Sequence, residues 1–111
     1  MEINIEIKVA KTFFSKFLGF MFKKDANYAL LFKNCKSIHT FFMRFNLDII
    51  FLDKENKVVK IVKNIRPFRI ILPVKNSFSI LEIPSNIAEL KDIMISDILL
   101  INEISKNQIK R

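Results

Sequence analysis

Glycine, cysteine, histidine and tryptophan are nearly missing from this chain of 111 residues, which has one glycine, one cysteine, one histidine and no tryptophan. The single cysteine, Cys35, excludes an intrachain disulfide and fits a reducing compartment. Because Gly19 is the one glycine, other residues must supply positive φ in the turns, and asparagine tolerates that conformation best. The expected turn residues lie between apolar runs: Asn27, Asn56, Asn76 and Asn86.

Long apolar runs are also missing. No stretch approaches the ~20 residues of a membrane-spanning helix. The opening "MEINIEIKV" carries acids and alternates, unlike the basic and then apolar start of a secretory signal. These features and the lone cysteine predict a cytoplasmic protein without a membrane span. Half of the residues are apolar, which excludes a disordered chain and provides for one core. We expect a single domain over residues 1–102 and a frayed polar tail over 103–111.

Acidic residues are outnumbered, since 19 basic and 11 acidic side chains give a formal charge of +8. A basic surface attracts nucleic acid, lipid headgroups or acidic partners. Nucleic-acid-binding proteins, however, cluster their charge and expose aromatic platforms, whereas arginine is scarce here and the lysines are scattered along the chain. The pattern therefore favours a lysine coat that keeps an apolar chain soluble. Nucleic acid is not the expected partner, although anion or nucleic-acid contact through the basic surface stays open as an alternative.

What the sequence has in abundance is short apolar segments with turn signals between them. In 3–9 the isoleucines alternate with polar residues, which is typical of a half-buried strand. The segment 47–52 is apolar on both faces, which indicates a central strand. A spacing near ten residues favours a mainly β sandwich or barrel of about seven or eight short strands. The expected strands are 3–9, 28–32, 38–43, 47–52, 57–62, 68–72, 77–83 and 93–101.

One helix is expected near the N-terminus. Apolar residues in "KTFFSKFLGFMFKK" recur at intervals of three and four, and Thr12 could cap the helix start while Gly19 lies near its end. The segment "PSNIAELKD", which begins at Pro84, is typical of one short helical turn.

Cys35, His39 and Met43 follow one another at intervals of four, and all three side chains can bind a soft metal ion. Metal sites normally gather more than one Cys or His, and a methionine within an aromatic run is usually part of a core. A Cys35 nucleophile with His39 as its base would need an orienting partner that the sequence does not indicate. Core packing is therefore favoured, and neither a metal nor a cofactor is predicted.

Two carboxylates are better candidates for a site. Asp48 lies at the entrance of the apolar segment 47–52, and Glu82 shares a strand face with Phe78 and Ile80. A buried carboxylate must be hydrogen-bonded or paired with a cation, or else it becomes neutral. The two acids either clamp strand ends or form the floor of a polar pocket. The candidate partners are His39, Thr40, Arg44, Arg66 and Arg69.

With these elements in place, the chain resembles the bacterial and archaeal family called domain of unknown function 192, from about Val9 to Leu100. The resemblance rests on "FLGFM" (17–21), "ALLF" (29–32), "HTFFMRFNLDIIFLD" (39–53) and "LEIP" (81–84), of which the third is the specific one. The chain departs from the family pattern in its shorter connection between Met43 and Asp48 and in its loss of glycines near Ser85 and Ser96.

The resemblance implies a compact, mostly β domain with one N-terminal helix and with no activity established for the class. The positions that match the recurrent motif coincide with the polar residues singled out above: His39, Thr40, Met43, Asp48 and Glu82. We therefore expect a non-catalytic binding or accessory module that holds a small ligand or peptide in a polar-ended pocket near Met43, Asp48 and Glu82. The alternative is a small acid–base enzyme that uses Asp48 or Glu82 with help from His39. The sequence leaves the oligomeric state open.

Overall fold

The structure is a computed structural model that describes residues 6–10, 19–35, 37–86 and 93–101. Its described part is mainly β, as the sequence predicts, and contains seven strands in two sheets. The strands are β1 (Ile7–Val9), β2 (Ala29–Phe32), β3 (Ile38–His39), β4 (Leu47–Leu52), β5 (Val58–Ile65), β6 (Ile70–Ile71) and β7 (Ser79–Pro84).

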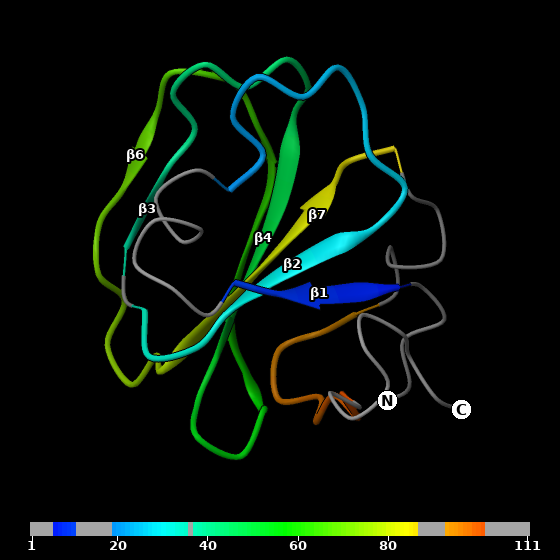
Figure 1. The fold of residues 1–111 in the computed structure, drawn as a ribbon. Coiled ribbons are helices and arrows are strands. Elements are labelled where there is room, and N and C mark those ends of the chain that lie inside the picture. Colours follow the sequence, from blue (N-terminus) through cyan, green and yellow to red (C-terminus); the bar gives the residue numbers. More distant parts are fainter. Residues whose placement is uncertain (1–5, 11–18, 36, 87–92, 102–111) are drawn as a thin grey trace.

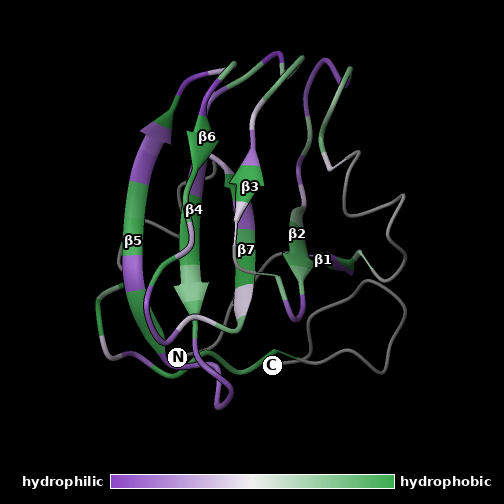
Figure 2. Cartoon of the chain, turned by 90° about the vertical axis from the view of Figure 1, so that its left-hand side faces the viewer, coloured by the Kyte–Doolittle hydropathy of each residue, from purple (hydrophilic) through white to green (hydrophobic). Residues whose placement is uncertain are grey.

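Five strands form the main sheet in the order β1-β2-β7-β4-β5, and β3 pairs with β6 in a second, two-stranded sheet. The pair β1–β2 is parallel, and the other neighbours in the main sheet are antiparallel. The small sheet lies in front of the main sheet in Figure 2 and to one side of it in Figure 1, so that it covers one face. The result is a two-layered sandwich.

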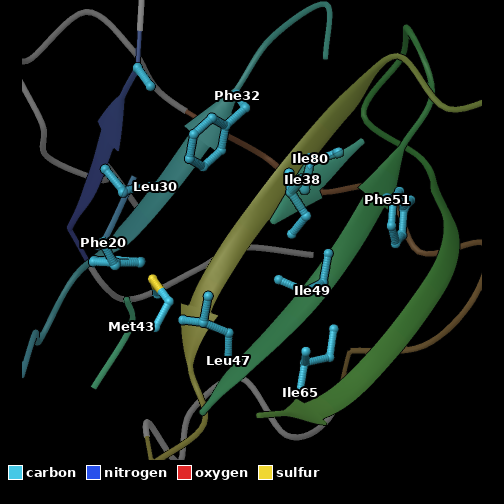
Figure 3. Close-up of a cluster of buried hydrophobic side chains, with 11 residues drawn as sticks. Phe20, Leu30, Phe32, Ile38, Met43, Leu47, Ile49, Phe51, Ile65 and Ile80 are labelled. Carbon is cyan, nitrogen blue, oxygen red and sulfur yellow. The ribbon is translucent and has the colours of Figure 1, made fainter. Parts of the chain in front are cut away.

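The central strands β4 and β7 are apolar on both faces, and each face has its own core. One core combines alternate residues of these strands with Ile93 and Leu99 from the chain after β7. The other core lies beneath the small sheet and includes Phe20, Ile38 and Met43 (Figure 3). Prediction and structure agree on β4, whose bounds match the expected segment 47–52, because a strand covered on both sides carries apolar residues on both faces.

The hairpin of β4 and β5 carries an irregularity that matters for the candidate site. The register between the two strands shifts between Leu47 and Ile49, and Asn64 on β5 has a φ of 60° there. A bulge of this kind bends its strand and re-aims the side chains around it. By contrast, the register between β4 and β7 is regular, with Asp48 opposite Ile83 and Ile49 opposite Glu82.

The expected helices are not borne out by the described residues. Most of the N-terminal helix falls on 11–18, outside the described residues, and the segment 19–22 at its end is a turn. The expected helical turn from Pro84 overlaps 87–92, which also lie outside, while Pro84 itself ends β7.

The last expected strand, 93–101, is wrong, because the described chain forms only isolated bridges there, at Ile98, which pairs with Lys57, and at Leu100. Asp97 Oδ2 accepts a hydrogen bond from the backbone N–H of Met94 (2.9 Å), and Ser96 has a φ of 76°. A side-chain-capped turn therefore interrupts the apolar run, and the alternation of apolar residues alone does not reveal it.

Candidate functional site

Three loops meet at one end of the sandwich, uppermost in Figures 1 and 2. They are 19–23 before β2, 40–46 between β3 and β4, and 66–69 between β5 and β6, and we call them together the loop end. The N–H of Phe22 donates to the carbonyl of Phe42 (2.9 Å), and the N–H of Phe68 donates to the carbonyl of Thr40 (2.8 Å). Backbone hydrogen bonds thus join all three loops.

Each of these loops places a phenylalanine at a turn position with positive φ. The φ angles are 65° at Phe22, 59° at Phe42 and 63° at Phe68. For a bulky side chain this conformation is a true outlier, and it persists only where the surroundings impose it. Such outliers gather at functional sites, so we take the loop end as the candidate site.

Two of the turns close by their own backbone hydrogen bonds. Lys23 N–H donates to the carbonyl of Phe20 (3.2 Å), and Met43 N–H donates to the carbonyl of Thr40 (3.4 Å). Each bond spans the i and i+3 residues of a β-turn, which puts Phe22 and Phe42 at position i+2. Glycine or asparagine normally occupies an i+2 position with positive φ.

The third turn is closed by a side chain from another loop. The buried Thr40 hydroxyl donates to the carbonyl of Arg66 and accepts from the N–H of Arg69, each at 2.8 Å. It therefore bridges the two groups that would bond each other in a simple turn, with Pro67 and Phe68 between them. Thr40, predicted as a pocket residue, lies at the loop end and positions Phe68.

The phenylalanine rings form a continuous aromatic row. Ring centroids lie 5.4 Å apart for Phe22 and Phe42, 5.6 Å for Phe42 and Phe68, and 6.4 Å for Phe68 and Phe41. The exposed fractions are 65% for Phe22, 51% for Phe42 and 56% for Phe68. His39 continues the row by stacking on Phe41, and its Nδ1 accepts a hydrogen bond from the N–H of Phe41 (3.1 Å).

Two hollows lie at the loop end, and the first of them borders the aromatic row. One, of about 420 Å³, is lined by Phe22, Phe42, Met43 and Arg44. The second, of about 320 Å³, runs past Arg66 and Arg69 toward β6. Met43 is the one predicted site residue that lines the first hollow, and it is otherwise buried in the core beneath it (Figure 3).

The charge of the loop end has one sign. The segments 19–24, 39–47 and 63–72 contain no aspartate or glutamate. The Nη1 atom of Arg69 donates to the carbonyls of Pro67 (3.4 Å) and Phe68 (3.3 Å), which holds this guanidinium beside the Phe68 turn. The cationic residues of these segments are Lys23, Lys24, Arg44, Lys63, Arg66 and Arg69.

Asp48 lies at the start of β4 and is half-buried. Its Oδ1 accepts hydrogen bonds from the N–H of Asn64 (2.9 Å) and from the hydroxyl of Ser85 (2.8 Å). These bonds tie the bulge in β5 to the end of β7, so this carboxylate holds strand ends together. The expected partners of Asp48 among arginines, His39 and Thr40 are therefore replaced by a backbone amide and a serine.

Glu82 lies in the middle of β7 and is only 3% exposed. Its Oε1 has no hydrogen-bond partner among the described residues, and a Cβ added to Gly19 would lie 3.5 Å from it. Burial raises the pKa of Glu82 to about 8. A buried carboxyl group is either paired with a hydrogen-bond donor or cation, or protonated and neutral. Glu82 is protonated at pH 7.

The two predicted acids do not converge. In the regular β4–β7 register, Glu82 shares a face with its opposite residue Ile49, whereas Asp48 is one position before Ile49 on β4. Since successive side chains on a strand point to opposite faces, the two carboxylates lie on opposite sides of the main sheet. An acid–base pair built from Asp48 and Glu82 has no geometric support, because proton transfer needs both groups within hydrogen-bond reach of one substrate.

The remaining candidates each have local contacts. Cys35 Sγ donates to the carbonyl of Ser37 (3.2 Å), while His39 and Met43 contribute to the aromatic row and the core. In the described ranges, no three His, Cys, Asp or Glu side chains are grouped to hold a metal ion. The described ranges contain no helix with the length and apolar character needed to cross a membrane.

A larger hollow, of about 970 Å³, lies at the opposite end of the sandwich beside the β4–β5 hairpin. It mixes acids such as Asp53 and Glu55 with lysines. Its positive-φ residues, Asn34 and Asn76, tolerate that conformation. The strained backbone and the charge of a single sign therefore distinguish the loop end.

The residues that the sequence predicts for the pocket do not include Phe22, Phe42 or Phe68. One signal was available, because a chain with a single glycine must place other residues at its positive-φ turn positions. Asn56 and Asn76 meet this expectation, whereas Asn27 and Asn86 do not have positive φ. The pair Pro67–Phe68 was a second signal, since proline favours position i+1 and leaves phenylalanine at i+2.

The fold and the loop end define a class of protein: a small two-layered β domain with one basic, aromatic end. The chain belongs to the family described as DUF192, uncharacterized ACR, COG1430, whose model matches residues 1–101. It is 37% identical over 97 residues to a UPF0127 protein of Thermococcus sibiricus, covering 82% of this chain and 62% of the relative. A UPF0127 protein of Pyrococcus furiosus is 34% identical, with 86% of each chain covered.

Two solved structures share the fold. A crystal structure of a protein of unknown function from Novosphingobium aromaticivorans has a TM-score of 0.71 and 21% identity, and the match covers 82% of this chain and 71% of that one. A crystal structure of a putative transcription regulator from Sinorhizobium meliloti has a TM-score of 0.69 and 18% identity, with 82% and 77% covered. At these identities the likeness concerns the fold alone.

Proposed function

We propose that this protein is a non-catalytic binding module whose ligand site is the loop end, centred on the hollow beside Met43. The observation that carries this proposal is the row of exposed phenylalanines held at positive φ by hydrogen bonds within and between the loops. An exposed aromatic surface on a rigid frame favours binding, because little conformational freedom is lost when a ligand arrives.

The charge of the loop end narrows the ligand to an anion with a planar or apolar part. The aromatic row offers ring faces, and Arg44 lies in the same hollow as Phe22 and Phe42. A guanidinium binds phosphate or carboxylate in a bidentate manner and also packs against aromatic groups. Of the five residues predicted for the pocket, Met43 lines the hollow, and Thr40 and His39 support the aromatic row. Asp48 holds strand ends of the main sheet together, and Glu82 is buried within β7 of that sheet.

The test is a titration of the full chain with phenyl phosphate, followed by two-dimensional ¹H–¹⁵N NMR. We expect the largest shift changes at the backbone amides of Phe22, Phe42, Met43 and Arg44. Phe42→Asn should reduce these changes. The control Met94→Ala should not, because it alters a 67% exposed side chain in the turn whose Ser96 N–H donates to the carbonyl of Val58 at the start of β5. Saturable changes around Asp53 and Phe78 instead, or none anywhere, would contradict the proposal.

A further inference from the structure

We propose that the natural occupant of the loop end is single-stranded nucleic acid, with bases packing on the aromatic row and phosphates bound by the arginines. This inference rests on the proposed binding function and names its ligand class. It departs from the expectation drawn from the sequence, where "FFMRF" (41–45) and "RPFR" (66–69) are two short segments far apart in the chain. The fold brings them together.

The first argument is chemical complementarity. Single-stranded nucleic acid is bound by aromatic faces on which bases stack and by cations that follow its backbone. Three of the four arginines of the chain lie at the loop end. Arg44 lines the hollow that Phe22 and Phe42 also line, and Arg66 and Arg69 flank Phe68 in the sequence and line the second hollow. Arginine is the residue suited to this role, because its planar fork matches phosphate oxygens and also stacks.

The second argument is the sign of the charge. A symmetric contact between two copies of the chain would place the same cations opposite one another, because such an interface uses one patch twice. With no acid in the segments 19–24, 39–47 and 63–72, that contact would be repulsive. A partner that carries regularly spaced negative charge complements this end better than a second copy does.

The third argument concerns rigidity and strandedness. The Thr40 hydroxyl fixes the Phe68 turn, and the Phe22–Phe42 backbone bond fixes the other two turns relative to each other. The rings are therefore presented without prior ordering of the loops. Stacking on protein aromatics needs bases with free faces, so a single strand fits and a duplex, whose bases already stack on each other, fits less well.

The experiment measures fluorescence anisotropy of a labelled oligothymidylate of about twelve nucleotides with the full chain. Phe42→Asn and Phe68→Asn should each weaken binding about fivefold or more, whereas Met94→Ala should leave it unchanged. Asparagine is chosen because it tolerates positive φ, so that the variants stay folded, as a thermal melt will check. A duplex of the same length should bind more weakly than the single strand.

Salt dependence tests the role of the arginines. The slope of log K against log salt is negative, and Arg66→Gln should make it shallower by about 0.7, the value for one phosphate contact to a single strand. The matched change Lys54→Gln, in the hollow at the opposite end, should not alter the slope. Equal effects of Arg66→Gln and Lys54→Gln, together with no effect of Phe68→Asn, would show diffuse charge attraction and overturn the proposal.

Other partners are outcomes of the same test. Binding to phosphatidylglycerol vesicles or to an acidic phenylalanine-containing peptide, without binding to the oligonucleotide, would overturn the nucleic-acid assignment. The proposed binding function would stand in that case if phenyl phosphate still perturbed Phe42 and Arg44. Loss of both the oligonucleotide and the phenyl phosphate responses would overturn both proposals.

Discussion

At the scale of single residues, Glu82 shows how a carboxyl group can be part of an apolar core. Its cross-strand neighbours are Leu30 and Ile49, and its Oε1 faces the one glycine of the chain, Gly19. Leaving a buried polar atom without a hydrogen bond costs free energy, and an ionised carboxylate would cost far more. The protonated carboxyl group therefore has the lower free energy in the core, which is why burial raises the pKa of Glu82 to about 8.

The raised pKa of Glu82 makes the free energy of unfolding depend on pH. Between pH 4.5 and about 8 the folded protein keeps a proton on Glu82 that the unfolded chain has released. The stabilisation associated with this proton is fully present below pH 4.5 and is lost as the pH rises to about 8. Each pKa unit of the shift corresponds to about 1.4 kcal/mol.

We therefore predict that Glu82→Gln reduces the fall in the free energy of unfolding between pH 5 and pH 8, because the amide does not titrate. Urea denaturation at several pH values measures this free energy. The control Glu55→Gln, at an exposed acid in the hairpin turn, should keep the wild-type slope. A Glu82→Gln protein whose pH dependence parallels that of the wild type would contradict the burial of an ionisable carboxyl at this position.

At the scale of elements, the β5 bulge and the end of β7 are joined through one side chain on β4. Asp48 Oδ1 accepts from Asn64 N–H and Ser85 Oγ–H, and Asn64 Oδ1 accepts from the side-chain amide of Asn46 (3.0 Å). The bulge thus receives side-chain hydrogen bonds where the ladder is interrupted. Because the β4–β5 hairpin leads into the loop 66–69, this cluster also supports the loop end from behind.

We predict that Asp48→Ala lowers the free energy of unfolding by about 1.5–3 kcal/mol, the range for hydrogen bonds to a charged group. Asp48→Asn should lower it less, because the amide oxygen can still accept from Asn64. Chemical denaturation of both variants measures the difference. Equal losses in the two variants would show that the charge of Asp48, and not its acceptor oxygen, stabilises the strand ends.

The three strained turns are the other feature at this scale. A non-glycine residue in the left-handed region costs about 1–2 kcal/mol relative to glycine, and a large ring adds no local compensation. Phe22, Phe42 and Phe68 recover part of this cost by packing on one another, at about 0.5–1.5 kcal/mol for each aromatic pair. Natural proteins tolerate such residues where function requires them, which is consistent with an exposed binding surface.

At the scale of the whole molecule, the chain carries a charge of +8 that is unevenly distributed. The hollow beside the hairpin mixes both signs, whereas the three segments of the loop end contain cations and no acid. Like charges that are held close together in the folded state repel one another, and dissolved salt screens this repulsion.

Raising sodium chloride from about 20 to about 300 mM should therefore raise the melting temperature, since the Debye length shrinks from tens of ångströms to below 10 Å. The variant Arg66→Gln/Arg69→Gln should respond less than the wild type, and Lys54→Gln/Lys75→Gln, in the mixed hollow, should respond like it. Differential scanning calorimetry measures both responses. A weaker response in the lysine variant than in the arginine variant would place the repulsion at the hairpin end instead.

The sequence by itself determined the strands of the main sheet, because apolar periodicity reports which segments are buried and on which faces. It predicted β4 in full, the β4–β5 hairpin and the mainly β class, and it indicated that Asp48 and Glu82 are unusual. It did not reveal the turn at Ser96, where one capping side chain decides the backbone path.

Only the tertiary structure decided which of these residues meet. The face on which a strand residue lies depends on register, and a difference of one position separates Asp48 from Glu82 by the thickness of the sheet. Likewise, Phe22 and the segments "FFMRF" (41–45) and "RPFR" (66–69) are far apart in the chain and meet because three loops end at the same edge of the sandwich. Proximity between distant segments comes from the pairing of strands, which local sequence patterns do not encode.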